Sequence, residues 1–148
     1  MGYRRDAREK AVQFLYQHEF NAVEDLDKAV EEFWAIPENA EANARAREFA
    51  DALIRGVFTH REESDAKIKA YSENWDFHRI SPVDKNVMRL AIYEMLHRDD
   101  IPPVVSINEA VEIAKRFSTA ESGKFVNGIL DKFKLELTRP FREAAGKK

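Results

Sequence analysis

The segment PVDKNVMRLAIYEMLHR, residues 82–98, constrains the fold more than any other stretch of this chain. Its apolar residues recur every three or four positions and cover most of the circumference of a helix. A helix that is apolar on most sides must be surrounded by other elements, so we predict a central, buried helix here. Glu94 lies within the apolar arc, and a buried carboxylate there needs a partner such as an arginine.

Helical spacing of apolar residues continues through the rest of the chain, and with only five glycines and five prolines it predicts an all-α fold. We expect about seven helices: at about 4–20, from 26 to near Pro37, through 46–57, at 68–71, at 82–98, at 106–117 and at 119–137. Ser106 and Glu109 have the spacing of a capping box that starts one helix, and Ser118 and Glu121 repeat it.

The length of 148 residues predicts a single domain, 1–148, and a composition 44% hydrophobic and 34% charged is typical of a folded soluble protein. Cysteine is absent, which excludes disulfides and agrees with a reducing cytoplasm. Neither a membrane span nor a signal peptide is evident, so we expect a cytoplasmic protein. The final GKK is expected to form a frayed tail.

Catalysis is not indicated. The four histidines, His18, His60, His78 and His97, lack metal-ligand spacing, and no phosphate-binding glycine loop or nucleophile elbow is present. We therefore predict a protein that is not an enzyme and that has no catalytic residue, no metal site and no cofactor.

The stretch SGKFVNGILDKF, residues 122–133, gives the clearest indication of a binding surface. On a helical wheel Gly128 falls nearly opposite the core stripe, in the sector that holds Glu121 and Lys124, with Phe125 at its edge. A missing side chain there suits a ligand that approaches the backbone closely. A ring beside an ammonium group suits an unstacked base and its phosphate.

A structural alternative stays open, in which another helix of the same protein packs over Gly128 and Phe125 fills the gap. Gly123 lies near the start of the helix, where backbone irregularity is common, and is given no special role.

The first helix carries a second row of the same kind, with Arg5, Arg8, Val12 and Tyr16 along one stripe beside its core face. The net charge is only −3, because an acidic region follows the basic start of the chain. The two rows support nucleic-acid binding only if the fold brings them side by side.

Three blocks of the sequence together resemble the NusB family of bacterial transcription antitermination factors. They are RRDAREKAVQFLYQHEF, NWDFHRISPVDKNVMRLAIYEM and IPPVVSINEAVEIAKRFSTAESGKFVNGILDKF, and KFVNG is the most specific motif among them. The region from about 21 to 70 is similar only in helical character. The resemblance implies a compact fold of two helical subdomains, about 1–60 and about 61–138, followed by a short tail.

The resemblance also implies a function: binding of the boxA element of ribosomal RNA leaders together with the ribosomal protein NusE. That pair joins other Nus factors on RNA polymerase, so that rRNA operons escape premature termination. The residues implicated in RNA binding are Arg4, Arg5, Arg8, Tyr16, Glu121, Lys124 and Phe125, to which the wheel adds Gly128. Those implicated in NusE binding are Asp84, Lys85 and Met88.

Two departures from the family pattern bear on these contacts: Pro103 replaces a tyrosine found in some relatives, and Asp6 interrupts the arginine run. Some family members form homodimers that cover their RNA surface, so a homodimer is possible here. The alternative functions are a stand-alone relative of the NusB-like domain of rRNA cytosine methyltransferases and a helical adaptor that binds only protein. The sequence shows no cofactor-binding βαβ region, so methylation by this chain alone is not expected.

Overall fold

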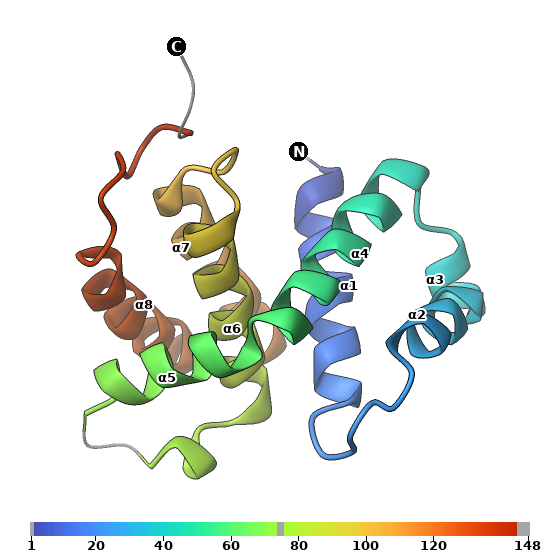
Figure 1. Cartoon of the computed structure of the whole chain (residues 1–148), viewed down its shortest axis with the longest axis horizontal. Coiled ribbons are helices and arrows are strands. Elements are labelled where there is room, and N and C mark those ends of the chain that lie inside the picture. Colours follow the sequence, from blue (N-terminus) through green and yellow to red (C-terminus); the bar gives the residue numbers. More distant parts are fainter. Residues whose placement is uncertain (1, 74–75, 145–148) are drawn as a thin grey trace. The chain divides into compact units, whose positions relative to one another are not determined.

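The structure, a computed structural model, describes residues 2–73 and 76–144. In these ranges it contains eight α-helices, one 3-10 turn and no strand, which confirms the predicted all-α fold (Figure 1). The helices are α1 (Tyr3–Gln17), α2 (Leu26–Ala35), α3 (Pro37–Ala40), α4 (Ala44–Thr59), α5 (Arg61–Tyr71), α6 (Pro82–His97), α7 (Pro103–Phe117) and α8 (Ala120–Lys134), with η1 at Phe77–Arg79. The chain divides into two compact units, Met1–Thr59 and His60–Lys148.

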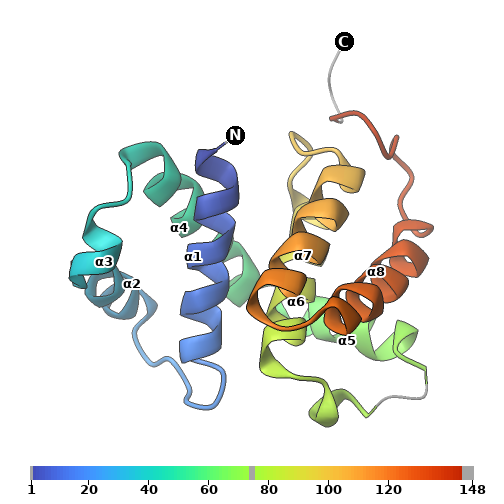
Figure 2. The same ribbon diagram turned by 180° about the vertical axis from the view of Figure 1, so that it is seen from behind.

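The first unit is built on α1 and α4, which pack side by side (Figures 1 and 2). Phe14 of α1 makes edge-to-face contacts with Phe33 of α2 and Phe58 of α4, at ring-centroid distances of 5.4 and 6.0 Å. Such aromatic contacts add specific geometry to the burial of apolar area and fix how the three helices meet. The helix α2 ends before Pro37, as expected from the restriction that proline places on the preceding residue.

The central helix of the second unit is α6, which packs against α5, α7 and α8. Met88, Ile92 and Met95 are at most 1% exposed, so the prediction of a central, buried helix is confirmed. Its start is fixed by Ser81, whose hydroxyl accepts the backbone N–H of Asp84 at 3.1 Å. No helix in the described part of the chain is both long and apolar enough to cross a membrane.

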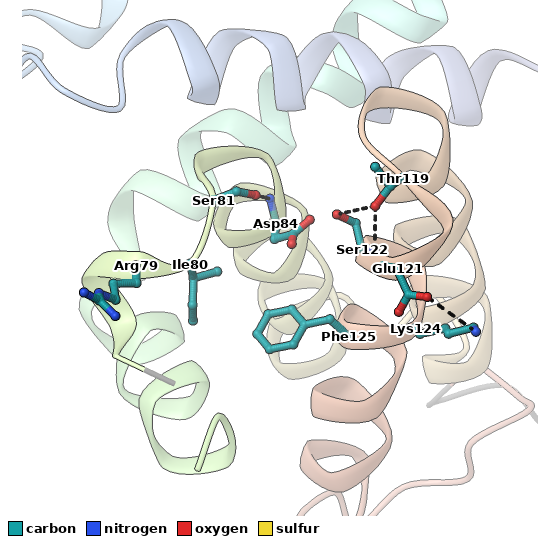
Figure 3. Close-up of a pocket in the computed structure, with 9 residues that line it drawn as sticks. All are labelled: Arg79, Ile80, Ser81, Asp84, Thr119, Glu121, Ser122, Lys124 and Phe125. Carbon is teal, nitrogen blue, oxygen red and sulfur yellow. Dashed lines mark hydrogen bonds and ion pairs between the residues drawn. The ribbon is translucent and has the colours of Figure 1, made fainter. Parts of the chain in front are cut away.

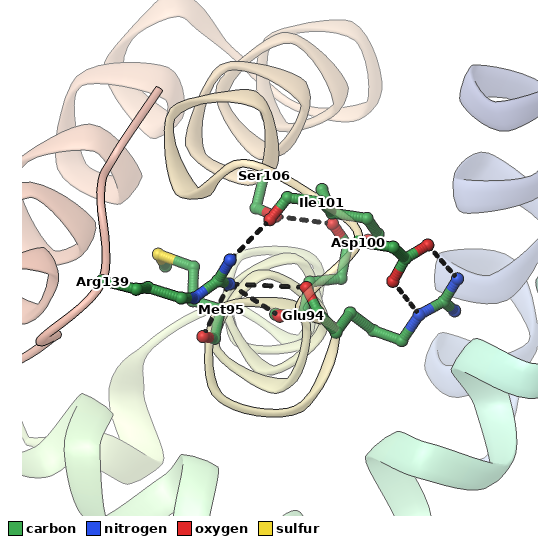
Figure 4. A network of polar contacts seen from close by, with 7 residues as sticks. Glu94, Met95, Asp100, Ile101, Ser106 and Arg139 are labelled. Atoms are coloured by element: carbon green, nitrogen blue, oxygen red, sulfur yellow. Dashed lines mark hydrogen bonds and ion pairs between the residues drawn. The ribbon is translucent and has the colours of Figure 1, made fainter. Parts of the chain in front are cut away.

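The start of α7 differs from the prediction. The helix begins at Pro103 rather than at Ser106, because proline suits the first helical position, and Ser106 lies one turn further on. Its hydroxyl donates to Glu94 at 2.7 Å instead of capping the helix (Figure 4). Glu94 is 1% exposed; this serine supplies a hydrogen-bond partner for the buried carboxylate, and the guanidinium of Arg98 interacts with it favourably through its charge.

The last helix also differs at both ends. Thr119 rather than Ser118 caps α8, accepting the N–H of Ser122 at 3.0 Å. The helix ends at Lys134 rather than near 137, and hydrogen bonds three residues apart tighten the turn that follows. The predicted frayed GKK lies outside the described residues.

Gly123 has a packing role that the sequence did not indicate. A Cβ atom at this position would lie 2.5 Å from Cγ of Lys115 and 3.6 Å from Cγ1 of Val111, both on α7. The absence of a side chain leaves room for the Lys115 side chain against α8, which corrects the prediction that Gly123 has no special role.

The segment after α8 returns to the end of α6. Arg139 donates to the backbone carbonyl groups of Met95 and Ile101 at 2.9 and 3.0 Å, and more weakly to those of Glu94 and Arg98 (Figure 4). The last carbonyl groups of a helix have no partner within it, so this guanidinium satisfies groups that would otherwise need water.

Candidate nucleic-acid interface

The basic face of α1 is organised by an aromatic ring of α4. The guanidinium carbon atoms of Arg4 and Arg8 lie 4.6 and 5.4 Å from the ring centroid of Phe49. Tyr3 meets the same ring edge-to-face at 6.4 Å. These cation–π contacts hold two arginines of the predicted RNA surface in defined positions.

The predicted row on α1 is only partly accessible. Arg8 is 3% exposed and Val12 is 1% exposed, so burial extends around the helix beyond the core stripe. This corrects the expectation that Arg8 faces solvent. Arg4 and Arg5 are partly exposed, and Tyr16 is 48% exposed. The accessible cations of this face are therefore those of its first turn, with Tyr16 as the accessible ring.

The start of α8 lines a hollow of about 570 Å³ (Figure 3). Its residues come from the segment before α6, the first turn of α6 and the start of α8: Arg79, Ile80, Ser81, Asp84, Thr119, Glu121, Ser122, Lys124 and Phe125. Figure 3 shows the Phe125 ring projecting into this hollow from α8. Three residues of the predicted RNA surface, Glu121, Lys124 and Phe125, thus line one cavity of the second unit.

The hollow combines both signs of charge with hydroxyl groups. Nζ of Lys124 lies 3.8 Å from Oε2 of Glu121, and both side chains are largely exposed. This ion pair therefore adds little stability and can be exchanged for contacts with a ligand. Arg79 supplies a second exposed cation. Arg79 was not among the residues predicted from the sequence, although it lies two residues before the serine that caps α6, in the RISPVD stretch.

Asp84 presents a buried carboxylate to this hollow. Its Oδ1 atom has no hydrogen-bond partner in the described structure. Burial raises the pKa of the carboxyl above its usual value, while hydrogen bonds from Ser122 and Ser81 act in the opposite direction. The unpartnered oxygen is itself buried, so it accepts a hydrogen bond from a ligand N–H group only if a neighbouring side chain moves aside.

The residues predicted to bind NusE are not arranged as an exposed patch. Met88 is fully buried, which excludes it as a direct partner contact in this conformation. Lys85 is 7% exposed and its ammonium group lies 4.5 Å from the ring centroid of Phe77. Asp84 faces the hollow described above. We therefore correct the direct role of Met88 to a packing role in the core of the second unit.

Gly128 lies on the exposed face of α8, as the wheel predicted. A Cβ atom there would meet no other element within 4 Å in the described part of the chain. No other helix of the second unit therefore packs over Gly128, and for that unit the structural alternative is wrong. The two surfaces belong to different units, so the single RNA track that joins them stays a prediction.

The fold and these surfaces define a class of protein. It is small and all-helical, and its surfaces combine aromatic rings with basic side chains, as surfaces that bind single-stranded nucleic acid do. The NusB family model matches residues 5–134. The chain belongs to the NusB family, which confirms the family indicated by the sequence.

Relatives support this assignment over nearly the whole chain. The transcription antitermination protein NusB of Myxococcus xanthus is 47% identical to this chain over 143 residues. The aligned region covers 95% of this chain and 100% of the relative. T. maritima NusB superposes with a TM-score of 0.80 at 44% identity, covering 92% of this chain and 93% of its own. The NusB in a structure of antitermination factors NusB and NusE with double-stranded RNA gives a TM-score of 0.79 at 27% identity, covering 91% of this chain and 98% of its own.

Proposed function

We propose that this protein is a transcription antitermination factor that binds boxA RNA of rRNA leader transcripts together with NusE. The observation that carries the proposal is the hollow at the start of α8, where an aromatic ring, cations, hydroxyl groups and carboxyl oxygens converge. Family membership supports it, because the similar structure named above holds NusB, NusE and RNA together.

In this mechanism the hollow takes an unstacked base. The base stacks on Phe125, while Lys124 and Arg79 contact the neighbouring phosphates. Asp84 and Glu121 accept hydrogen bonds from base amino or imino groups, which discriminates among bases as a ring alone cannot. The exposed backbone at Gly128 lets the strand continue close along α8.

The first unit extends the track. In this proposal Arg4 and Arg5 hold phosphates, and Tyr16 offers a second stacking surface. Arg8 contributes by packing on Phe49 beside Arg4 rather than by reaching the strand itself.

NusE binding adds to RNA binding if both proteins contact one continuous strand, and the coupling is then reciprocal. In our proposal Lys85 and Met88 support this contact by fixing the start of α6, and the complex acts on RNA polymerase with other Nus factors. The protein acts by binding and not by catalysis, as the antitermination role of its relatives supports. Its place of action is that of bacterial transcription, the cytoplasm.

A binding titration with labelled boxA RNA, with and without NusE, tests this function. We expect specific binding that strengthens when NusE is added and weakens steeply as salt is raised. Lys124→Ala should lower the salt slope by about one unit, the effect of losing one phosphate contact. Binding of NusE without any affinity for RNA would instead indicate a protein-only adaptor.

Gly128→Ala separates a ligand surface from a packing position. We expect the free energy of unfolding to rise by up to about 1 kcal/mol, because alanine favours the helix and its methyl group meets open space. RNA affinity should fall about fivefold or more, which corresponds to losing about 1 kcal/mol of close backbone contact. Thermal unfolding and the RNA titration measure the two effects, and unchanged RNA affinity would place the strand away from this face.

A further inference from the structure

Three side chains of metal-ligating type meet at the second unit, away from the hollow. His60 is the residue between α4 and α5, Glu63 lies in the first turn of α5, and His97 is the last residue of α6. One ligand atom from each lies within 4.8 Å of the others. The spacing of the histidines had indicated no such arrangement, because His97 is distant in sequence and the helices α5 and α6 bring it close.

The distances between the donor atoms suit coordination after rotation of the side chains. Nε2 of His97 lies 2.8 Å and Nδ1 of His60 lies 3.6 Å from the same oxygen, Oε1 of Glu63. Ligand bonds of about 2.0–2.1 Å in tetrahedral geometry separate the donor atoms by about 3.3 Å. The separations of the two ring nitrogens from Oε1 lie on both sides of this value, and all three donor atoms lie within 4.8 Å of one another.

Ring stacking holds the two imidazoles together. The centroids of His60 and His97 are 3.8 Å apart with an interplanar angle of 20°, and Tyr93 stacks beside both at 5.8 and 5.6 Å. The lone pair of each ring nitrogen lies in the plane of its ring, so the two rings rotate out of this stack when both coordinate the same ion.

We propose that His60, Glu63 and His97 bind a divalent transition metal ion of the zinc class. Two imidazole nitrogens and one carboxylate oxygen are a donor set for zinc, cobalt or nickel, whereas calcium and magnesium prefer oxygen ligands alone. His60 is half-buried and the other two residues are exposed, so an ion can enter from solvent. The ion would tie the start of α5 to the end of α6 and leave a coordination position to water.

The rival explanation is a cluster held only by the hydrogen bond between His97 and Glu63. Titration of the metal-free full chain with zinc, followed by calorimetry, distinguishes the two. We expect one ion to bind per chain and the unfolding temperature to rise with zinc concentration. Cobalt should give the visible absorption bands of a tetrahedral site. Absence of saturable zinc binding would overturn the proposal.

Variants locate the ion. His97→Ala and Glu63→Gln should each weaken zinc binding by about tenfold or more. His78→Ala removes an exposed histidine from η1 and is the matched control, with affinity expected to equal that of the unmodified chain. Far-UV circular dichroism checks that each variant folds. Glu63→Gln keeps the size of the side chain, so it still tests the proposal if His97→Ala does not fold. Equal zinc affinity in all three variants would place the ion elsewhere and overturn the proposal.

Discussion

Phe125→Ala is expected to weaken boxA RNA binding by about fivefold to 150-fold, the cost of about 1–3 kcal/mol for one lost base stack. The ring is half-buried and projects into the hollow at the start of α8 (Figure 3). Its removal takes away the stacking surface but leaves the cations Lys124 and Arg79 in place. The loss of RNA affinity should therefore be similar at all salt concentrations. Fluorescence anisotropy with labelled RNA measures it.

The matched control for this variant is Phe141→Ala. Phe141 is also a half-buried phenylalanine of the second unit, and a lysine, Lys134, lies over its ring at 5.1 Å, but it does not line the hollow. Its loss should leave RNA affinity unchanged. Phe125→Trp should retain most of the affinity, because it keeps an aromatic face. Equal affinity of Phe125→Ala and the unmodified chain would remove the hollow from the RNA path.

Arg139→Ala is expected to lower the free energy of unfolding by about 2–4 kcal/mol, because charged donors contribute about 1.5–3 kcal/mol per hydrogen bond. Its guanidinium donates to carbonyl groups at the end of α6 and to Ile101 (Figure 4). Without it these groups lose their donor, and the returning segment loses an attachment to the helix. Differential scanning calorimetry should show a fall in melting temperature on the order of 10 °C.

Arg142→Ala provides the comparison, since Arg142 is an exposed arginine of the same segment. It should shift the melting temperature by no more than about 2 °C, as surface substitutions usually do. Arg139→Lys should recover only part of the stability, because one ammonium group cannot address several carbonyl groups in the geometry of a guanidinium. A melting temperature of Arg139→Ala equal to that of Arg142→Ala would contradict this role.

The helices were predictable because their signals are local. In α6 the apolar residues cover the helix on most sides, and this pattern alone indicated its central position. The outward position of Gly128 followed from its angle on the wheel. The helix starts were less predictable: Ser106 has the spacing of a cap, but Pro103 begins α7 one turn earlier. Local rules rank possible starts, and packing selects among them.

Several roles depended on residues that are distant in sequence. Arg8 was predicted as an exposed phosphate ligand and lies buried against Phe49, and Met88 was predicted as a partner contact and lies in the core. Asp84 was assigned to the NusE surface and faces the same hollow as Phe125. In each case the side chain's neighbours belong to another helix.

The amino-acid order by itself determined the helical class, the family and the outward face of α8, because each depends on periodicity or on a contiguous motif. Only the tertiary structure decided which charged groups are buried, that Gly123 faces the Lys115 side chain, and that His60, Glu63 and His97 meet. The physical reason is that burial and ligand geometry are set by distances between helices, and a helical period carries no information about those distances.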